Sequence, residues 1–372
     1  MLIKNKSIFY YFVFLLIILI FIFSSKDIKN GSDLTKYLIW QSNLDFRNII
    51  DFFPYIFSNR FDGPFFFVSV IIYKIIYSLD FLFNWEKLFI FFNFFLIFFT
   101  FYLLSKILVI KEIIRLSLLA ILFWFNLEYS LWVNYTLTDI FFSTLTLVFL
   151  YFLINEKKIL SFFIFLIIFL TRSTSFAVLF FLLQYIFFKI LKRNLKLTYV
   201  FIILLISNLL LLLACSYFIF YFDSSNVVID SKINYFNDKL TRGIIIDDRP
   251  ETYINGTVNL LFFFKVMFLR FFYFFNFYAD GYSFSHKIYN ILYFSFLYLG
   301  ILINSLYIKL YSKKVKEIIF LMILFILSFA VFHSIYLIDY DWRYRVPTYG
   351  PMIYLSFLGY SKILQKIFYK IN

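Results

Sequence analysis

The sequence predicts an all-α protein, a polytopic membrane helix bundle with about ten spans. Three observations lead to this fold class. The 372 residues are 63% hydrophobic and 26% aromatic, and their mean hydropathy is +0.88. Charged residues make up only 15% of the chain and cluster between long apolar runs, whereas soluble domains carry about a quarter. Most of the chain therefore requires lipid rather than water around it.

Twelve apolar stretches are candidates for membrane-spanning helices, which need about 20 residues each. They lie at 8–23, 65–79, 88–110, 116–133, 138–154, 159–171, 174–191, 198–222, 259–278, 288–308, 318–338 and 346–361. Two of them are interpreted as helices that do not cross, because 65–79 is short and contains Lys74, and 259–278 is interrupted by Lys265 and Arg270. Ten spans then remain in a single transmembrane domain over 1–372, with both termini cytoplasmic.

The distribution of charge supports this topology. The segments assigned to the cytoplasm hold 18 basic and 3 acidic residues, a net charge of +15, and the rest of the chain has a net charge of −1. Because Lys and Arg concentrate in cytoplasmic loops, we expect a multi-pass protein of the inner (plasma) membrane. Anionic lipids account for the basic balance, and no nucleic-acid partner is expected. Two large outer loops follow, 24–87 with a juxtamembrane helix and 223–287.

Histidine and cysteine are too scarce for the usual metal cages and disulfides. The chain has two histidines, His286 and His333, and one cysteine, Cys215. A bound ion would therefore need carboxylate oxygens, which favour a hard cation such as Mg²⁺ or Mn²⁺ over zinc. No metal ligand is assigned, and such a cation is the one cofactor left open. His333, inside a predicted span, is interpreted as a buried, hydrogen-bonded imidazole.

Acidic residues near membrane depth form two groups of interest, because inserting a charge costs at least about 2.5 kcal/mol. In GSDLTKY, Asp33 and Tyr37 would share a helix face, and the residues alone favour a capping role for Asp33. In NYTLTD, Thr138 or Asp139 would cap the helix over 138–154. Two carboxylates on one side of the membrane also allow them to converge, as a base with its partner or as a cation site.

Arginines mark two further groups. Arg172 lies between two short apolar runs without an acidic neighbour in sequence, so a structural role requires a carboxylate such as Asp139 or Glu128. An anion-binding role is equally supported, since the guanidinium fork matches phosphate oxygens. The fourth group, DYDWRYRVPTYGP at 339–351, directly precedes the last predicted span. Interfacial anchoring accounts for part of this pattern only.

Taken in this order, the four groups resemble the GT-C superfamily of integral-membrane glycosyltransferases, which includes the bacterial aminoarabinose and protein O-mannosyl transferases. The first matching features are an outer acidic residue after the first span, here Asp33, and a proline-containing outer helix, here with Pro64. A helix that opens with Asp follows, here at Asp139, and then a basic residue after the next helix, here Arg172. The last feature is a late string that contains Arg and Pro, here 343–351. The chain departs from the usual pattern in two places, with Ser32-Asp33 for an Asp-Glu pair and Gly63-Pro64 for a double proline.

The resemblance implies a GT-C-like fold and an inverting hexosyl- or pentosyltransferase. A sugar would move from a polyprenyl-phosphate donor to a glycan, lipid or protein acceptor of the cell envelope, on the non-cytoplasmic face. Asp33 would be the general base, with Asp27 and Asp45 in reserve, and Asp139 an auxiliary carboxylate. The implied substrate-binding residues would hold the phosphate or contact the sugar: Tyr37, Arg172, Asp341, Arg343, Tyr344 and Arg345.

Two other functions are open. A polysaccharide polymerase of the O-antigen kind would use Arg242 and Arg249 of the second outer loop, require a diphosphate-linked oligosaccharide donor, and tolerate the loss of Asp33. A flippase or transporter would carry charged or Gly/Pro-broken helices at the bilayer midplane, and repeated halves. The sequence shows neither feature, and its ionisable residues gather at one predicted outer rim.

Overall fold

The computed structural model describes residues 28–30, 34–49, 52, 54–55, 63–110, 112–221, 227–247, 249–278, 281–336 and 343–369. Over these ranges the regular structure is helical, with an isolated bridge between Lys29 and Tyr135 and no β-strand. The predicted all-α class is therefore confirmed. The first predicted span, together with Asp27, Asp33 and Asp341, lies outside the described residues.

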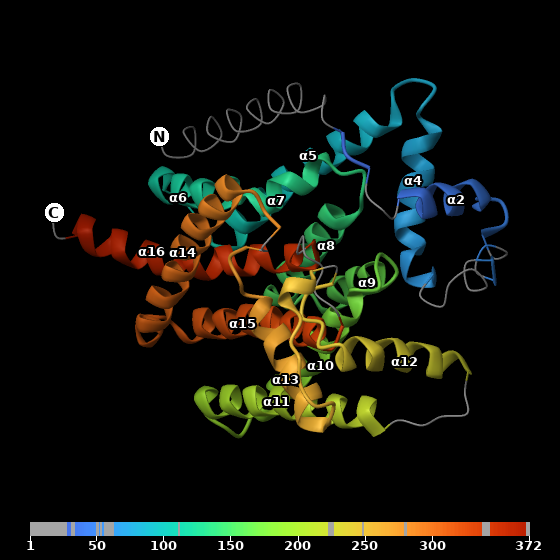
Figure 1. Ribbon diagram of the computed structural model, residues 1–372. Helices are drawn as coiled ribbons and strands as arrows, with labels where there is room; N and C mark the ends of the chain where they lie inside the picture. The colour runs from blue at the N-terminus through green and yellow to red at the C-terminus, as the bar shows by residue number, and fades with distance from the viewer. Residues whose placement is uncertain are drawn as a thin grey trace. The chain divides into compact units, whose positions relative to one another are not determined.

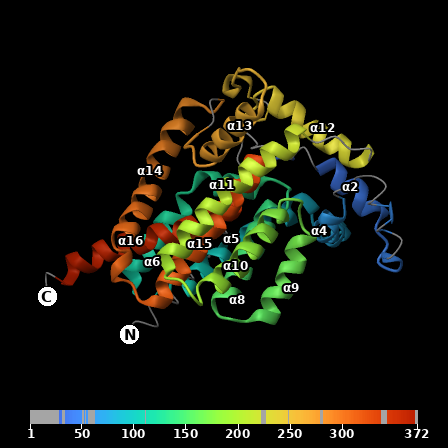
Figure 2. The same ribbon diagram turned by 90° about the horizontal axis from the view of Figure 1, so that it is seen from below.

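The chain forms two compact units, and the first comprises Met1–Phe176, Leu297–Tyr311 and Val346–Asn372. Within it α8 packs against α5 and α9, α16 packs on α5 and α6, and α2 lies on α4 (Figures 1 and 2). The described helices of this unit are α2 (Leu34–Asn43), η1 (Gly63–Phe66), α4 (Phe67–Ser78), α5 (Trp85–Ile107), α6 (Ile113–Trp124), α7 (Leu127–Leu131), η2 (Trp132–Asn134), α8 (Asp139–Ile154), α9 (Lys158–Phe169), η4 (Ile308–Leu310) and α16 (Tyr349–Tyr369).

The second unit comprises Ala177–Phe296 and Ser312–Arg345. Here α13 packs between α11 and α15, and α12 contacts α11 and α13. Its described helices are α11 (Leu197–Tyr221), α12 (Val227–Thr241), η3 (Pro250–Thr252), α13 (Leu260–Tyr273) and α15 (Lys313–Ile335). Three further helices run from one unit into the other: α10 (Ser175–Leu191), α14 (Phe284–Leu306) and η5 (Arg343–Thr348).

Four of the described helices, α5, α11, α14 and α15, are long and apolar enough to cross a membrane. A fifth is added if α6 and the segment Leu127–Asn134 form one bent span. The other predicted spans in the described residues include α8, α9 and α10, which have 16, 12 and 17 residues and so extend about 24, 18 and 26 Å. A total of about ten crossings stays a prediction.

The helix expected over 116–133 is not continuous, which corrects the prediction for this segment. Its two parts are bent by 64° relative to each other. The break lies at Phe125 and Asn126, and the Asn126 side chain accepts a hydrogen bond from the Tyr129 amide at 3.1 Å and so caps α7. Asparagine competes for backbone donors and favours such caps over helix interiors. A short polar residue in an apolar run thus ends α6.

Helices α14 and α16 touch through their backbones within the first unit. A Cβ atom added to Gly359 would lie 2.1 Å from the carbonyl oxygen of Gly300. That distance is far below van der Waals contact, so only glycine fits there unless the helices separate. At Gly350, on the same helix, an added Cβ would lie 3.3 Å from the nearest heavy atom, the flexible Leu147 side chain.

We therefore predict that Gly359→Ala destabilises the protein and Gly350→Ala does not. Overpacking against backbone costs about 1–3 kcal/mol. At Gly350 the Leu147 side chain needs to shift only by a few tenths of an ångström, and the higher helix propensity of alanine, up to about 1 kcal/mol over glycine, offsets that shift. Thermal unfolding of the detergent-purified variants measures the difference. Equal melting temperatures for the two variants would show that α14 and α16 do not make this close contact.

Candidate functional site at the start of helix α8

The hairpin of α8 and α9 carries a charged pair at its open end. Nη1 of Arg172 lies 2.5 Å from Oδ2 of Asp139, and the two residues are 3% and 4% exposed. Of the two carboxylates considered for Arg172 from the sequence, Asp139 is therefore the partner. A buried ion pair in an apolar hairpin is the feature on which the rest of the site is built.

The connection between the helices explains why these two residues meet. α8 ends at Ile154 and α9 begins at Lys158, and Glu156 in the turn adopts a left-handed backbone with φ of 58°. Antiparallel helices joined by so short a loop align the start of the first with the end of the second. Asp139 opens α8 and Arg172 follows α9, so the pairing comes directly from helix lengths and a tight turn.

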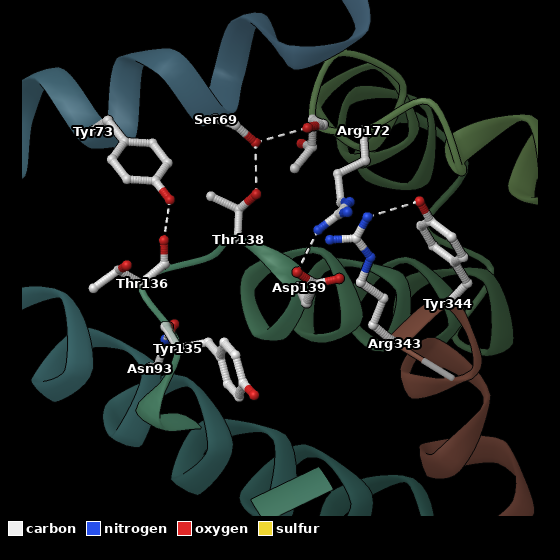
Figure 3. Close-up of polar contacts among 11 residues, drawn as sticks. Ser69, Tyr73, Asn93, Tyr135, Thr136, Thr138, Asp139, Arg172, Arg343 and Tyr344 are labelled. Carbon is white, nitrogen blue, oxygen red and sulfur yellow. Dashed lines mark hydrogen bonds and ion pairs between the residues drawn. The ribbon is translucent and has the colours of Figure 1, made fainter. Parts of the chain in front are cut away.

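Thr138 occupies the N-cap position of α8, but its side chain makes no capping hydrogen bond. This corrects the expectation that a side chain of Thr138 or Asp139 caps the helix. The Thr138 hydroxyl instead lies 2.9 Å from the Ser69 hydroxyl on α4, and Asp139 pairs with Arg172. Both polar side chains at the start of α8 are thus directed to other elements rather than to their own helix (Figure 3).

Helix α4 bridges the two ends of the hairpin. Ser69 donates its hydroxyl to the Thr171 carbonyl at 2.7 Å, and one turn further on the Tyr73 hydroxyl donates to the carbonyl of Thr136. The Val68 amide donates to the Leu170 carbonyl at 2.8 Å. Figure 3 shows Ser69 and Tyr73 projecting from the same face of α4 toward these groups. The predicted outer-loop helix therefore holds the end of α9 and the approach to α8 together.

The extended residues before α8 obtain their remaining hydrogen bonds from two other segments. Asn93 of α5 donates its amide to the carbonyls of Val133 and Tyr135, at 3.2 and 3.0 Å. Lys29 forms the isolated parallel bridge: its amide donates to the Asn134 carbonyl at 2.9 Å, and the Thr136 amide donates to its carbonyl at 3.1 Å. We call the set formed by these contacts the polar junction; it comprises Ser69, Tyr73, Asn93, Thr136, Thr138, Asp139 and Arg172.

Tyr37 is the predicted sugar-contacting residue that lies next to the polar junction. Its ring is 1% exposed and stacks on the Tyr73 ring, with centroids 4.7 Å apart and an interplanar angle of 15°. The edge of Phe66 adds a contact at 5.9 Å. The ring thus serves the packing of α2 on α4, and its contact with a sugar stays a prediction.

The predicted arginines of the late string belong to the second unit. Arg343 donates from Nη2 to the Tyr344 hydroxyl at 3.1 Å, and its guanidinium lies 5.0 Å from that ring centroid. Arg345 is buried and donates from Nη1 to the carbonyls of Phe274 and Asn276, at 3.0 and 2.6 Å. Arg345 therefore closes the C-terminal end of α13, a contact between distant segments that its sequence neighbours do not signal.

Two further expectations from the sequence concern the environment of His333 and the presence of a group of metal-ligating side chains. His333 is 1% exposed, and its Nε2 lies 3.3 Å from the Tyr344 carbonyl, which confirms the interpretation as a buried, hydrogen-bonded imidazole. In the part of the chain that the structure describes, no three His, Cys, Asp or Glu side chains are grouped as a metal ion would require. The convergence of the late string with Asp33 and Asp139 in one pocket stays a prediction.

Comparisons of the chain with protein-family models, with curated proteins and with solved structures find no match. The polar junction offers a buried carboxylate, a guanidinium held against it, and two hydroxyl groups within 3 Å of each other. Such a set can accept a proton, bind a hydroxyl and stabilise negative charge.

We predict that breaking the buried ion pair by removing one partner destabilises the protein far more than breaking an exposed pair. Removing one partner of a buried pair costs about 3–5 kcal/mol, whereas exposed pairs contribute about 0–1 kcal/mol. Asp139→Ala is expected to lower the melting temperature strongly, and Asp238→Ala, which breaks the exposed pair with Arg242, only slightly. The double variant Asp139→Ala/Arg172→Met should recover part of the loss, because no unpaired charge is left; additive losses would contradict a direct pair.

A second prediction concerns the hydroxyl of Tyr73. Tyr73→Phe leaves the Thr136 carbonyl without its donor, and an unsatisfied buried polar group costs about 1–3 kcal/mol. Tyr77→Phe on the same helix is the control, because Tyr77 is 43% exposed and water can replace its hydroxyl. Equal melting temperatures for both variants in detergent would show that the Tyr73 hydroxyl does not hold the segment before α8.

Proposed function

We propose that this protein is a membrane glycosyltransferase that moves a sugar from a polyprenyl-phosphate donor to an acceptor hydroxyl of the cell envelope, on the non-cytoplasmic face. The observation that carries the proposal is the buried Asp139–Arg172 pair at the start of α8. Ionisable residues in membrane proteins are costly and mark functional sites by default. A merely structural hairpin would be more stable with apolar residues of similar volume in their place.

The proposed reaction needs few groups, and the chain has them. An acceptor hydroxyl loses its proton to a carboxylate as its oxygen attacks the anomeric carbon. The bond from that carbon to the phosphate oxygen breaks with inversion, and the polyprenyl phosphate leaves with the electron pair. Guanidinium groups stabilise the charge that develops on the phosphate. In this proposal Asp33 is the base and Asp139 the auxiliary carboxylate, as the GT-C resemblance implies.

The arginines divide into two roles. Arg172 compensates the charge of Asp139, and its planar guanidinium is the kind of group that binds phosphate oxygens. Arg343 is only partly buried and lies over an aromatic ring, an arrangement that suits a phosphate-binding arginine. Arg345 is committed to two backbone carbonyls, and we assign it the positioning of its neighbours Arg343 and Tyr344. Asp341 and Tyr37 are proposed to contact the sugar.

One observation favours a different function, a lipid flippase or transporter. The 64° break between α6 and α7 is followed at once by Glu128, which is 3% exposed. Broken helices with ionisable residues are typical of transport sites. Asn126 nevertheless caps α7 after the break, and the chain then leads directly into the polar junction. We therefore interpret the break as a feature that builds the site, and we rank transport as the second candidate function.

The decisive experiment compares cell-surface glycans by mass spectrometry in cells with and without the gene, and in cells that carry single variants. We predict that the wild-type gene adds a sugar mass and that Asp139→Asn reduces its yield by about 10²-fold or more, the usual weight of a catalytic proton acceptor or its partner. Asp33→Asn should abolish transfer. Asp238→Asn, in the exposed pair with Arg242, is the matched control and should leave the yield unchanged.

Membrane levels and detergent elution profiles of each variant show whether the protein still inserts and folds. Identical glycans with and without the gene would refute a transferase. Full yield from Asp139→Asn would remove Asp139 from the reaction. If purified protein in vesicles consumed only diphosphate-linked oligosaccharides, the polymerase would replace our assignment, and lipid movement without sugar transfer would establish the flippase.

A further inference from the structure

Arg270 is a buried arginine in the second unit that the proposed reaction does not use. It lies in the last turn of α13 and has no exposed surface. Its Nε donates to the Ile244 carbonyl at 2.7 Å. Its two terminal nitrogens, Nη1 and Nη2, are buried and have no hydrogen-bond partner in the described structure. The planar end of the guanidinium is therefore left without an acceptor.

A buried arginine with unpaired donors lowers the stability of the folded protein. Leaving buried donors of a charged group unsatisfied costs about 1–3 kcal/mol or more, and native structures leave few such groups without a reason. Burial lowers the pKa of Arg270 to about 9, and the nearby Asp247 carboxylate acts in the opposite direction. With this pKa the side chain stays charged at neutral pH, so deprotonation does not relieve the cost of the buried charge.

The surroundings favour an incoming anion over an internal partner. Asp247, the carboxylate whose charge acts on Arg270, is already bound through Oδ1 by the Lys239 ammonium at 3.3 Å. Arg270, Lys239 and Asp247 together carry a net charge of +1. Helix α13 also carries part of the apolar core of this unit, with Val266 and Met267 about one turn before Arg270; that core cluster consists of Ile219, Leu240, Ile245, Ile246, Phe262, Phe263, Val266 and Met267. A dry, net-positive setting strengthens the attraction to an anion.

We propose that Arg270 anchors a binding site for a phosphate group, the two Nη atoms each donating to one phosphate oxygen. This end-on fork is the geometry in which arginine binds phosphate in two parallel hydrogen bonds. A phosphate also has oxygens left for a further donor, which a carboxylate held in this way does not. Arg270 and Ile244–Ile246 are buried, so the proposed site requires a movement of the segment 243–247 before the ligand can reach the two Nη atoms. The site does not rest on the proposed sugar transfer.

Binding is tested on the purified full-length protein in a non-ionic detergent, by calorimetry and by the shift in melting temperature. Inorganic phosphate and dodecyl phosphate are the two probes, with acetate as the carboxylate comparison. We expect Arg270→Lys to weaken binding about tenfold or more, because lysine cannot reproduce the fork. Asp247→Asn should strengthen binding at least about twofold by removing a nearby negative charge. Arg242→Lys, at an exposed arginine of the same unit, should change nothing.

Each outcome either distinguishes a lipid headgroup from a free phosphate group as the ligand or contradicts the proposed site. Similar binding of both probes supports a site for the phosphate group itself, and binding of dodecyl phosphate alone supports a lipid headgroup. The proposal is overturned if wild-type protein binds neither probe, if acetate binds as well as phosphate, or if Arg242→Lys weakens binding as much as Arg270→Lys. Should Arg270→Lys fail to fold, a lack of effect of Asp247→Asn on phosphate affinity would also overturn it. No sugar or acceptor is present, so the result is independent of the glycan experiment.

Discussion

The ion pair between Asp139 and Arg172 is the constraint from which the arrangement of the first unit follows. Neither charge is tolerated alone in an apolar interior, so the start of α8 and the end of α9 must lie within contact of each other. The carbonyls of Leu170 and Thr171 are then fixed beside them, and α4 binds both through Val68 and Ser69. One electrostatic requirement thus places three helices.

A second requirement comes from the backbone between α7 and α8. Residues 135–137 are not helical, and their amides and carbonyls need partners from elsewhere because lipid supplies none. Asn93, Tyr73 and Lys29 supply them from α5, α4 and the segment before α2. The interrupted helix is therefore what allows polar groups to collect in an otherwise apolar unit. The non-helical backbone and the polar side chains that could take part in a reaction therefore lie together for the same physical reason.

Sequence patterns predicted the local elements well and the contacts between elements only in part. Helix ends near Asp139, Ile154 and Phe169 follow from apolar run length and from the charges that bound each run. The need of Arg172 for a carboxylate was also evident, because an unpaired guanidinium is costly anywhere near lipid. Its choice of Asp139 over Glu128 depends on hairpin geometry, which one-dimensional spacing does not contain.

Sequence patterns do not predict several other features of the structure. The break at Asn126 depends on a single cap in an apolar run, and α12 lies in a segment whose mixed polarity indicates an outer loop rather than a helix. Tyr37 looks like an interfacial aromatic, yet Tyr73 and Phe66 from other helices enclose it. The sequence pattern indicates only that Arg270 interrupts an apolar stretch. The residues that interact with its side chain, Ile244 and Asp247, are more than 20 positions away in the chain.

The shortness of α9 has a consequence for biosynthesis. A 12-residue helix spans only about 18 Å, which is less than the hydrocarbon thickness of a bilayer, and it is followed at once by an arginine. Such a segment partitions poorly from the translocon by itself. Asp139 neutralises Arg172, and in the predicted topology the lysines of the turn stay on the cytoplasmic side. We therefore expect α8 and α9 to insert together as one co-translational unit.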